Sequence, residues 1–259
     1  MTDPKLEQDV QAEPGAPQQR SDATHWAAPT TVLAVADVPV GATNLNVAGR
    51  RLVGPIQGFG QLWQKTYRVR LDGSIVTPSG VIREWKADYS RFWPKGSRFH
   101  ASIIEPGEVV LIDSQSLGGI QVSSGIRVIY ADEESFSFMN AAGHPAAGMI
   151  TFSASQEDGV TRAQVQVLIR ANDPFYDVML PIYGQRMEDA IWTHTLRALA
   201  AHLGATPGEV LVRRVLVDSR RNWSQARNIW QNAAIRSGIY MMLAPLRWTA
   251  ARLARRVGD

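Results

Sequence analysis

The chain has 259 residues, of which 45% are hydrophobic, so it is long enough for one core domain with extensions. The formal net charge is only +3 at pH 7, and a nucleic-acid role would therefore have to rest on a local basic region. The chain contains no cysteine, which excludes disulfides, thiolate catalysis and cysteine-bound metals.

Residues 1–30 are rich in Gln, Pro, Asp, Glu and Ala, with hardly a large apolar side chain before Trp26. Such a composition cannot offset the entropy lost on ordering. It also lacks the basic stretch followed by an apolar one that marks a secretory signal. We predict a disordered tail over 1–30 and a globular domain over 31–204.

Two elements are expected ahead of the main sheet. The run from Gln64 to Leu71 alternates in the manner of a strand. Thr77 and Pro78 suit the N-cap and first turn of a helix that should end near Pro94. The stretch Gly58-Phe59-Gly60 lacks the register of a phosphate-binding loop and is typical of a turn-rich approach to a strand.

Alternating apolar and polar residues then predict strands at 109–113, 120–130, 135–139, 149–155 and 159–171. Acidic residues at 132–134 and the pair Asp158-Gly159 mark hairpin turns, so these strands should be antiparallel. The connection 140–148, which holds Gly143-His144-Pro145, is predicted to be irregular. In the last strand a solvated outer face is favoured over a polar cavity lining for Arg162, Gln164, Gln166 and Arg170.

A long helix should follow the sheet. Asp173 and Pro174 are placed to start it, whereas Pro181 and Gly184 interrupt its first half and predict a kink or a short separate helix. Gly204 suits its C-terminal end. An apolar stripe spaced to lie across a sheet is formed by Trp192, Leu196, Leu199 and Leu203.

The order of strand, helix, antiparallel strands and long helix predicts an α+β helix-grip domain. In this fold class a curved antiparallel sheet wraps around a long C-terminal helix and leaves a cavity between them. The expected basic helical extension would follow the domain.

Several motifs in this order resemble the START-like helix-grip superfamily, also called SRPBCC. They are the run 125–130, the acidic turn, Phe136-Ser137-Phe138, Gly143-His144-Pro145, Gly148, Phe152 and the long helix. The likeness covers roughly 109–204 and is greatest to a bacterial domain family of uncharacterised function. Where that family has acidic residues after Gly148, this chain has Met149 and Ile150. The resemblance implies a cavity for lipids, sterols, polyketides or other apolar molecules, and it covers both plain binders and enzymes.

We therefore expect binding of a small apolar or lipid-like ligand between the sheet and the long helix. The alternative is a cyclase- or hydratase-like enzyme acting in the same cavity. A plain binder predicts a closed, mostly apolar cavity, whereas an enzyme predicts at least two polar groups converging inside. No cofactor is expected. The candidate ligand-binding residues are Phe138, His144, Phe152 and Trp192.

Among polar residues, His144 is the candidate general acid or base, although a hydrogen bond that fixes its loop is favoured. His194 and His202 share a helix but have no third ligand in register, so no metal site is predicted. Charges at the start of a helix or on the surface are the favoured interpretation of Asp173, Asp177, Glu188 and Asp189.

The last region, 205–259, is interpreted as a basic amphipathic helical extension, with one more strand considered within 208–218. From Arg213 onward there are ten Arg and two Asp. The stretch from Trp223 to Val257, broken at Pro245, combines Trp and Arg with apolar residues, as interfacial helices do. Its apolar face could meet a membrane, the domain itself or a second copy in a homodimer. Nucleic acid is the least favoured partner, and the expected location is cytoplasmic, with contact to the inner face of the membrane left open.

Overall fold

The computed structural model describes residues 22–100, 103–115, 121–180, 184–206 and 208–243. Its sheet has nine strands in the order β3-β4-β5-β6-β7-β8-β2-β9, with β1 paired to β6, and every pair is antiparallel. The strands are β1 (Leu52–Val53), β2 (Leu62–Arg70), β3 (Ser97–His100), β4 (Val109–Gln115), β5 (Gln121–Ala131), β6 (Ser135–Ala141), β7 (Ala146–Glu157), β8 (Val160–Ala171) and β9 (Leu211–Asp218).

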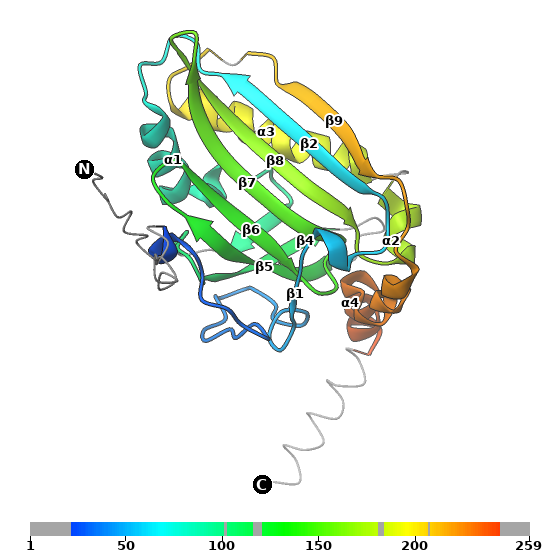
Figure 1. Cartoon of the computed structure of the whole chain (residues 1–259). Coiled ribbons are helices and arrows are strands. Elements are labelled where there is room, and N and C mark those ends of the chain that lie inside the picture. The colour runs from blue at the N-terminus through cyan, green and yellow to red at the C-terminus, as the bar shows by residue number, and fades with distance from the viewer. Residues whose placement is uncertain (1–21, 101–102, 116–120, 181–183, 207, 244–259) are drawn as a thin grey trace, which may run out of the picture.

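Two helices, α1 and α3, lie against the same face of this sheet (Figure 1). The long helix α3 crosses the sheet with Trp192, Leu196 and Leu199 buried, as the apolar stripe predicted. The predicted α+β fold, an antiparallel sheet packed against a long helix, is thus confirmed. The helices are α1 (Pro78–Ala87), α2 (Pro174–Met179), α3 (Gln185–His202) and α4 (Ala233–Met242), and the 3-10 helices are η1 (Ala23–His25), η2 (Pro55–Gln57), η3 (Tyr89–Phe92) and η5 (Trp223–Gln231).

Both predicted helix starts are confirmed. The Thr77 hydroxyl accepts a hydrogen bond from the Gly80 N–H at 3.1 Å, and Asp173 Oδ1 accepts one from the Tyr176 N–H at 3.1 Å. The first helix is shorter than expected, because Asp88 leaves the helical region at φ −142° and ψ 49° and a separate η3 follows. The predicted helix start at Asp173 belongs to α2, a short helix that is separate from α3.

The sheet is more extensive than the sequence predicted. Strand β6 continues to Ala141 and strand β7 begins at Ala146, so most of the connection 140–148 is regular structure. Strand β3 was missed, because its four residues give too short a pattern. The sheet also continues past residue 204, where we expected the domain to end, because β9 pairs with β2.

The N-terminal boundary also differs from the expected tail over 1–30. The Ala27 N–H donates to the Ile129 carbonyl at 2.9 Å, and the Trp26 ring lies 4.7 Å from that of Tyr130. Trp26 supplies the apolar surface that the residues before it lack. Residues 1–21, Ile120, Pro181 and the end of the extension from 244 to 259 lie outside the described residues.

Candidate functional site

The candidate residues Phe138, Phe152 and Trp192 come together in one aromatic cluster between the sheet and α3. The ring of Phe152 lies 5.2 Å from that of Phe138 and 5.7 Å from that of Trp192, and it stacks on Phe136 at 4.6 Å. All four side chains are buried. They pack closely where a cavity was expected.

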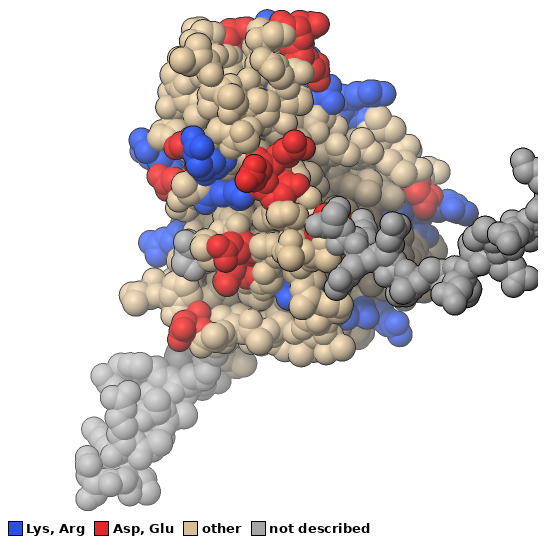
Figure 2. Space-filling view, turned by 60° about the vertical axis from the view of Figure 1, so that its left-hand side comes forward, with Lys and Arg blue, Asp and Glu red and all other residues tan. Residues whose placement is uncertain are grey.

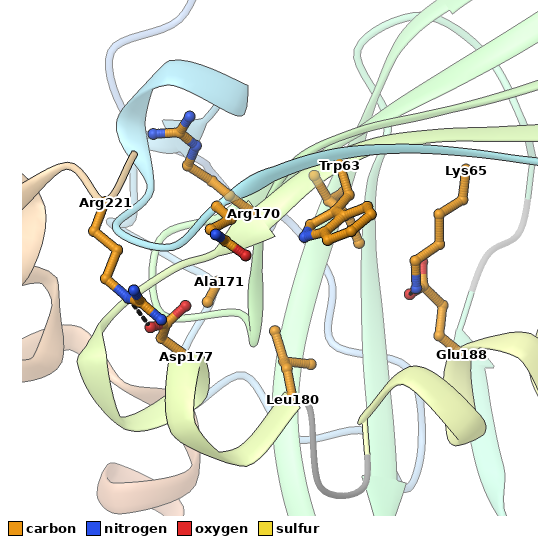
Figure 3. Close-up of a pocket in the computed structure, with 10 residues that line it drawn as sticks. Trp63, Lys65, Arg170, Ala171, Asp177, Leu180, Glu188 and Arg221 are labelled. Atoms are coloured by element: carbon orange, nitrogen blue, oxygen red, sulfur yellow. Dashed lines mark hydrogen bonds and ion pairs between the residues drawn. The ribbon is translucent and has the colours of Figure 1, made fainter. Parts of the chain in front are cut away.

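A pocket opens instead at the end of the sheet next to α2 (Figure 3). Its volume is about 110 Å³. Trp63 and Ile169 are paired residues on the inner face of β2 and β8, and Leu180 lies opposite them at the end of α2. Figure 3 shows Trp63 pointing from the sheet toward Leu180. The middle of the pocket is therefore an apolar slot.

Its inner end is formed by an ion pair between Lys65 of β2 and Glu188 in the first turn of α3. The two side chains are only 5% and 17% exposed. Burial is the main influence on the pKa of Glu188 and raises it, while the Lys65 ammonium opposes that shift. Because water solvates this position poorly, each charge is stabilised mainly by the opposite charge of its partner.

A second polar contact lies next to this pair. The Tyr67 hydroxyl donates to Asp189 Oδ1 at 2.7 Å, and Arg214 Nη2 donates to Asp189 Oδ2 at 2.5 Å. Burial, followed by the Glu188 charge, raises the pKa of Tyr67. Strands β2 and β9 are thus tied to the start of α3 by two adjacent carboxylates, which the positive N-terminal end of a helix also favours.

The outer end of the pocket carries a more exposed ion pair. Arg221 Nε donates to Asp177 Oδ2 at 2.6 Å, and the Arg221 side chain is 49% exposed. Arg170 follows Ile169, so its side chain projects to the other face of the sheet, where it pairs with Asp218 at 3.2 Å. That face is covered here, because Gly58 approaches Arg170 so closely that a Cβ would lie 2.7 Å from its Cγ.

These positions differ from the surface role expected for Asp177 and Glu188. Both lie in the first turn of a helix, as predicted, but they line the pocket and are largely buried. One signal could have found Glu188. Lys65 shares its face of β2 with the apolar Val69, so a buried cation there requires a buried acid from the covering helix.

His144 lies away from this pocket, in the Gly-His-Pro turn between β6 and β7. Its Nδ1 accepts a hydrogen bond from the Ala146 N–H at 3.2 Å, and burial lowers its pKa to about 4. The turn also receives the C-terminal segment, η5 with α4, because the Ala233 N–H donates to the Gly143 carbonyl at 2.9 Å. The structure thus does not bring His144 together with the other three candidates.

The C-terminal segment docks through small and polar residues. Asn228 donates to the Asn172 carbonyl at 3.0 Å, and Asn232 donates to Asp173 Oδ2 at 3.0 Å. Ala233 and Ser237 are also buried. Several large apolar side chains of the segment are exposed: Trp223, Trp230, Ile235, Ile239, Met241, Met242 and Leu243.

A second hollow of about 380 Å³ lies between the loop 34–39 and strands β3 and β4. His100 at its edge contacts the buried Asp113 at 3.1 Å. In the described part of the chain, His, Cys, Asp and Glu form no group of three or more that could hold a metal ion. No described helix combines the length and apolar character needed to cross a bilayer.

Charge is mixed on the face turned forward in Figure 2. Lys and Arg residues there are interspersed with Asp and Glu residues. Since a nucleic-acid surface gathers basic residues into a patch or stripe, this face does not favour that partner.

No family model and no curated protein matches the chain. Similar solved structures include protein Ms6760 from Mycobacterium smegmatis, with 18% identity over 55% of this chain and 91% of that one and a TM-score of 0.39. Protein CV1439 from Chromobacterium violaceum has 18% identity over 56% and 98%, with a TM-score of 0.36. The di-domain ARO/CYC protein StfQ from the steffimycin biosynthetic pathway has 11% identity over 56% and 51%, with a TM-score of 0.43, so this chain spans about half its length. The likeness concerns the fold alone.

Proposed function

We propose that the protein binds a small, mostly apolar molecule in the pocket between β2 and the helices α2 and α3. The observation that carries this proposal is the apolar slot of Trp63, Ile169 and Leu180 between two ion pairs. An apolar cavity of roughly 150 Å³ can bind benzene. A pocket of about 110 Å³ with an exposed end therefore suits a small ring or the end of a longer molecule.

Under this proposal the aromatic cluster has a packing role. Phe138, Phe152 and Trp192 pack against one another between the sheet and α3. The fold supplies the frame, since it places a long helix across a sheet with their apolar faces together.

The proposal is tested by filling the slot. Toluene binding to the full chain is measured by ligand-observed NMR, and native mass spectrometry records any molecule that co-purifies. Leu180→Trp should abolish toluene binding, because the larger side chain occupies the slot. Val178→Trp is the matched control, since Val178 is on the same helix and 64% exposed. Unchanged toluene binding in Leu180→Trp would refute the proposed site.

The enzyme alternative is favoured by one observation, the convergence of Lys65 and Glu188 at the inner end of the pocket. A buried carboxyl group with a raised pKa is suited to general acid–base catalysis. An enzyme would convert a co-purified molecule on incubation, and Glu188→Gln would slow that conversion. A bound mass that stays constant in the wild-type protein supports plain binding.

We further propose that the C-terminal segment attaches the protein to an anionic membrane surface. Its large apolar side chains face outward, with Trp230 83% and Met242 73% exposed. The stretch 219–243 contains four Arg and no Asp or Glu. Exposed Trp and apolar residues flanked by Arg suit the headgroup region, where each basic residue contributes about 1 kcal/mol.

Vesicle co-sedimentation of the full chain tests this attachment. Trp230→Ser with Met242→Ser should reduce pelleting with vesicles of phosphatidylcholine and phosphatidylserine. Ile75→Ser is the matched control, because Ile75 is equally apolar and fully exposed elsewhere. The proposal fails if the wild-type protein does not pellet with vesicles. If the wild-type protein then forms a dimer that the double variant does not form, the partner of the segment is a second copy of the chain.

A further inference from the structure

Strand β9 forms an open edge of the sheet. It is the last strand in the sheet order and pairs with β2 on one side, while no described strand pairs with its other side (Figure 1). Among the described residues, no backbone–backbone hydrogen bond joins residues 211–217 to a segment other than β2. Such an edge presents a row of unpaired N–H and C=O groups that can accept another strand. The opposite edge, β3, has only four residues and offers a much shorter row.

The side chains along this edge do little to oppose pairing. Natural edge strands often carry charges that discourage the approach of another strand. In β9, Arg214 is neutralised by Asp189, and Arg213 is the charged side chain of the strand interior that has no described ion-pair partner. The exposed fractions of the apolar side chains lie between 38% and 61% for Leu211, Val215, Leu216 and Val217.

A second copy of β9 fits this edge in one antiparallel register. A twofold axis perpendicular to the sheet produces antiparallel pairing, and the axis must pass through a residue, because opposite residues share their hydrogen-bonding role. An axis at Arg213 or Arg214 would place like charges opposite each other, which is destabilising. An axis at Leu216 would meet the irregularity at Val217, where Leu216 and Asp218 pair with consecutive residues of β2. An axis at Val215 avoids both problems.

We propose that two copies of the protein associate through β9, paired antiparallel about a twofold axis at Val215, so that their sheets become one continuous sheet. Charges beside the strand favour a second copy as the partner. Glu209 is exposed just before β9, and Arg220 is 88% exposed just after it. Antiparallel pairing brings Glu209 of each copy toward Arg220 of the other. The contact uses none of the apolar residues of η5 and α4.

The mass of the full chain in solution tests the association. Size-exclusion chromatography with light scattering should give twice the mass of one chain for the wild-type protein. Val215→Lys should give the mass of one chain, because two like charges would face each other at the axis. Ile75→Lys is the matched control and should remain a dimer, since Ile75 is fully exposed in a loop. A monomeric wild-type protein, or a Val215→Lys dimer, would overturn the proposal.

Cross-linking tests the register without disturbing the charge. The chain has no cysteine, so a single introduced thiol can form a disulfide only with a second copy. Val215→Cys should cross-link rapidly on mild oxidation, because the Cβ atoms of opposite residues lie about 5 Å apart. Arg213→Cys on the same strand is the matched control. Its thiols would be more than about 10 Å apart, since four residues of strand separate them, and should react much more slowly. Equal rates in the two variants would refute the axis at Val215.

Discussion

The carboxylate of Glu188 in α3 meets the ammonium of Lys65 in β2 in the space between helix and sheet, where both side chains are largely buried. Breaking a buried pair leaves one uncompensated charge, which costs about 3–5 kcal/mol, whereas replacing both partners with apolar residues can be neutral. We expect Lys65→Met to lower the free energy of unfolding by several kcal/mol. Urea denaturation followed by circular dichroism measures this.

The control is the double variant Lys65→Met with Glu188→Met. It should recover most of the lost stability, because no charge remains unpaired and the side-chain volumes are similar. Equal losses in the single and double variants would show that the cost lies in packing and that the ion pair contributes little.

Gly143 supports the docking of the C-terminal segment. Its φ is +96°, and a Cβ at this position would lie 2.0 Å from the backbone oxygen of Gln231. Gly143→Ala should therefore displace the segment as well as strain the turn. Faster hydrogen exchange across 223–242 is the expected result.

Gly159→Ala is the matched control for this prediction. Gly159 also has a positive φ, +74°, but nothing lies within 4 Å of the added Cβ. It should cost only the roughly 1–2 kcal/mol of a left-handed backbone and leave exchange in the C-terminal segment unchanged. If both variants speed exchange equally, strain rather than the close approach to Gln231 explains the effect.

The aromatic cluster should determine stability more than binding. Phe152 is fully buried and contacts Phe136 and Trp192, so Phe152→Ala should cost about 3–5 kcal/mol through lost burial and a residual cavity. The same change at Phe175, which is 40% exposed on α2, should cost much less. Toluene affinity at the pocket should be retained in Phe152→Ala under conditions where the variant is folded, and its loss would show that the cluster also contacts the ligand.

Sequence periodicity predicted most of the fold because each main strand and α3 bury one face. The stripe through Trp192 and the caps at Thr77 and Asp173 follow from local rules that tertiary contacts did not override. The pocket could not be predicted in this way. It depends on pairing between Lys65 and Glu188, residues far apart in the chain, and on aromatic packing that fills the expected cavity.

The C-terminal segment shows a second limit of pattern reasoning. Its amphipathic pattern left the membrane, the domain and a second copy open as partners of the apolar face, and the domain contacts Asn228, Asn232 and Ala233 instead. The reason is the polar edge offered by Gly143 and Asp173, which needs hydrogen-bond partners more than apolar surface. The periodicity of one element does not reveal the polarity of the surface that receives it.

His144 should make stability depend on pH. Burial lowers its pKa to about 4 from the usual 6.5, so the folded protein holds it neutral where the unfolded chain binds a proton. Its contribution is therefore fully present above pH 6.5 and is lost as the pH falls toward 4. The full difference corresponds to up to about 3 kcal/mol. His144→Asn, which keeps an acceptor for the Ala146 N–H, should flatten the decline in the free energy of unfolding between these values. His194→Asn on the exposed side of α3 is the control for the substitution itself. A decline in His144→Asn as steep as in the wild-type protein would show that other groups cause it.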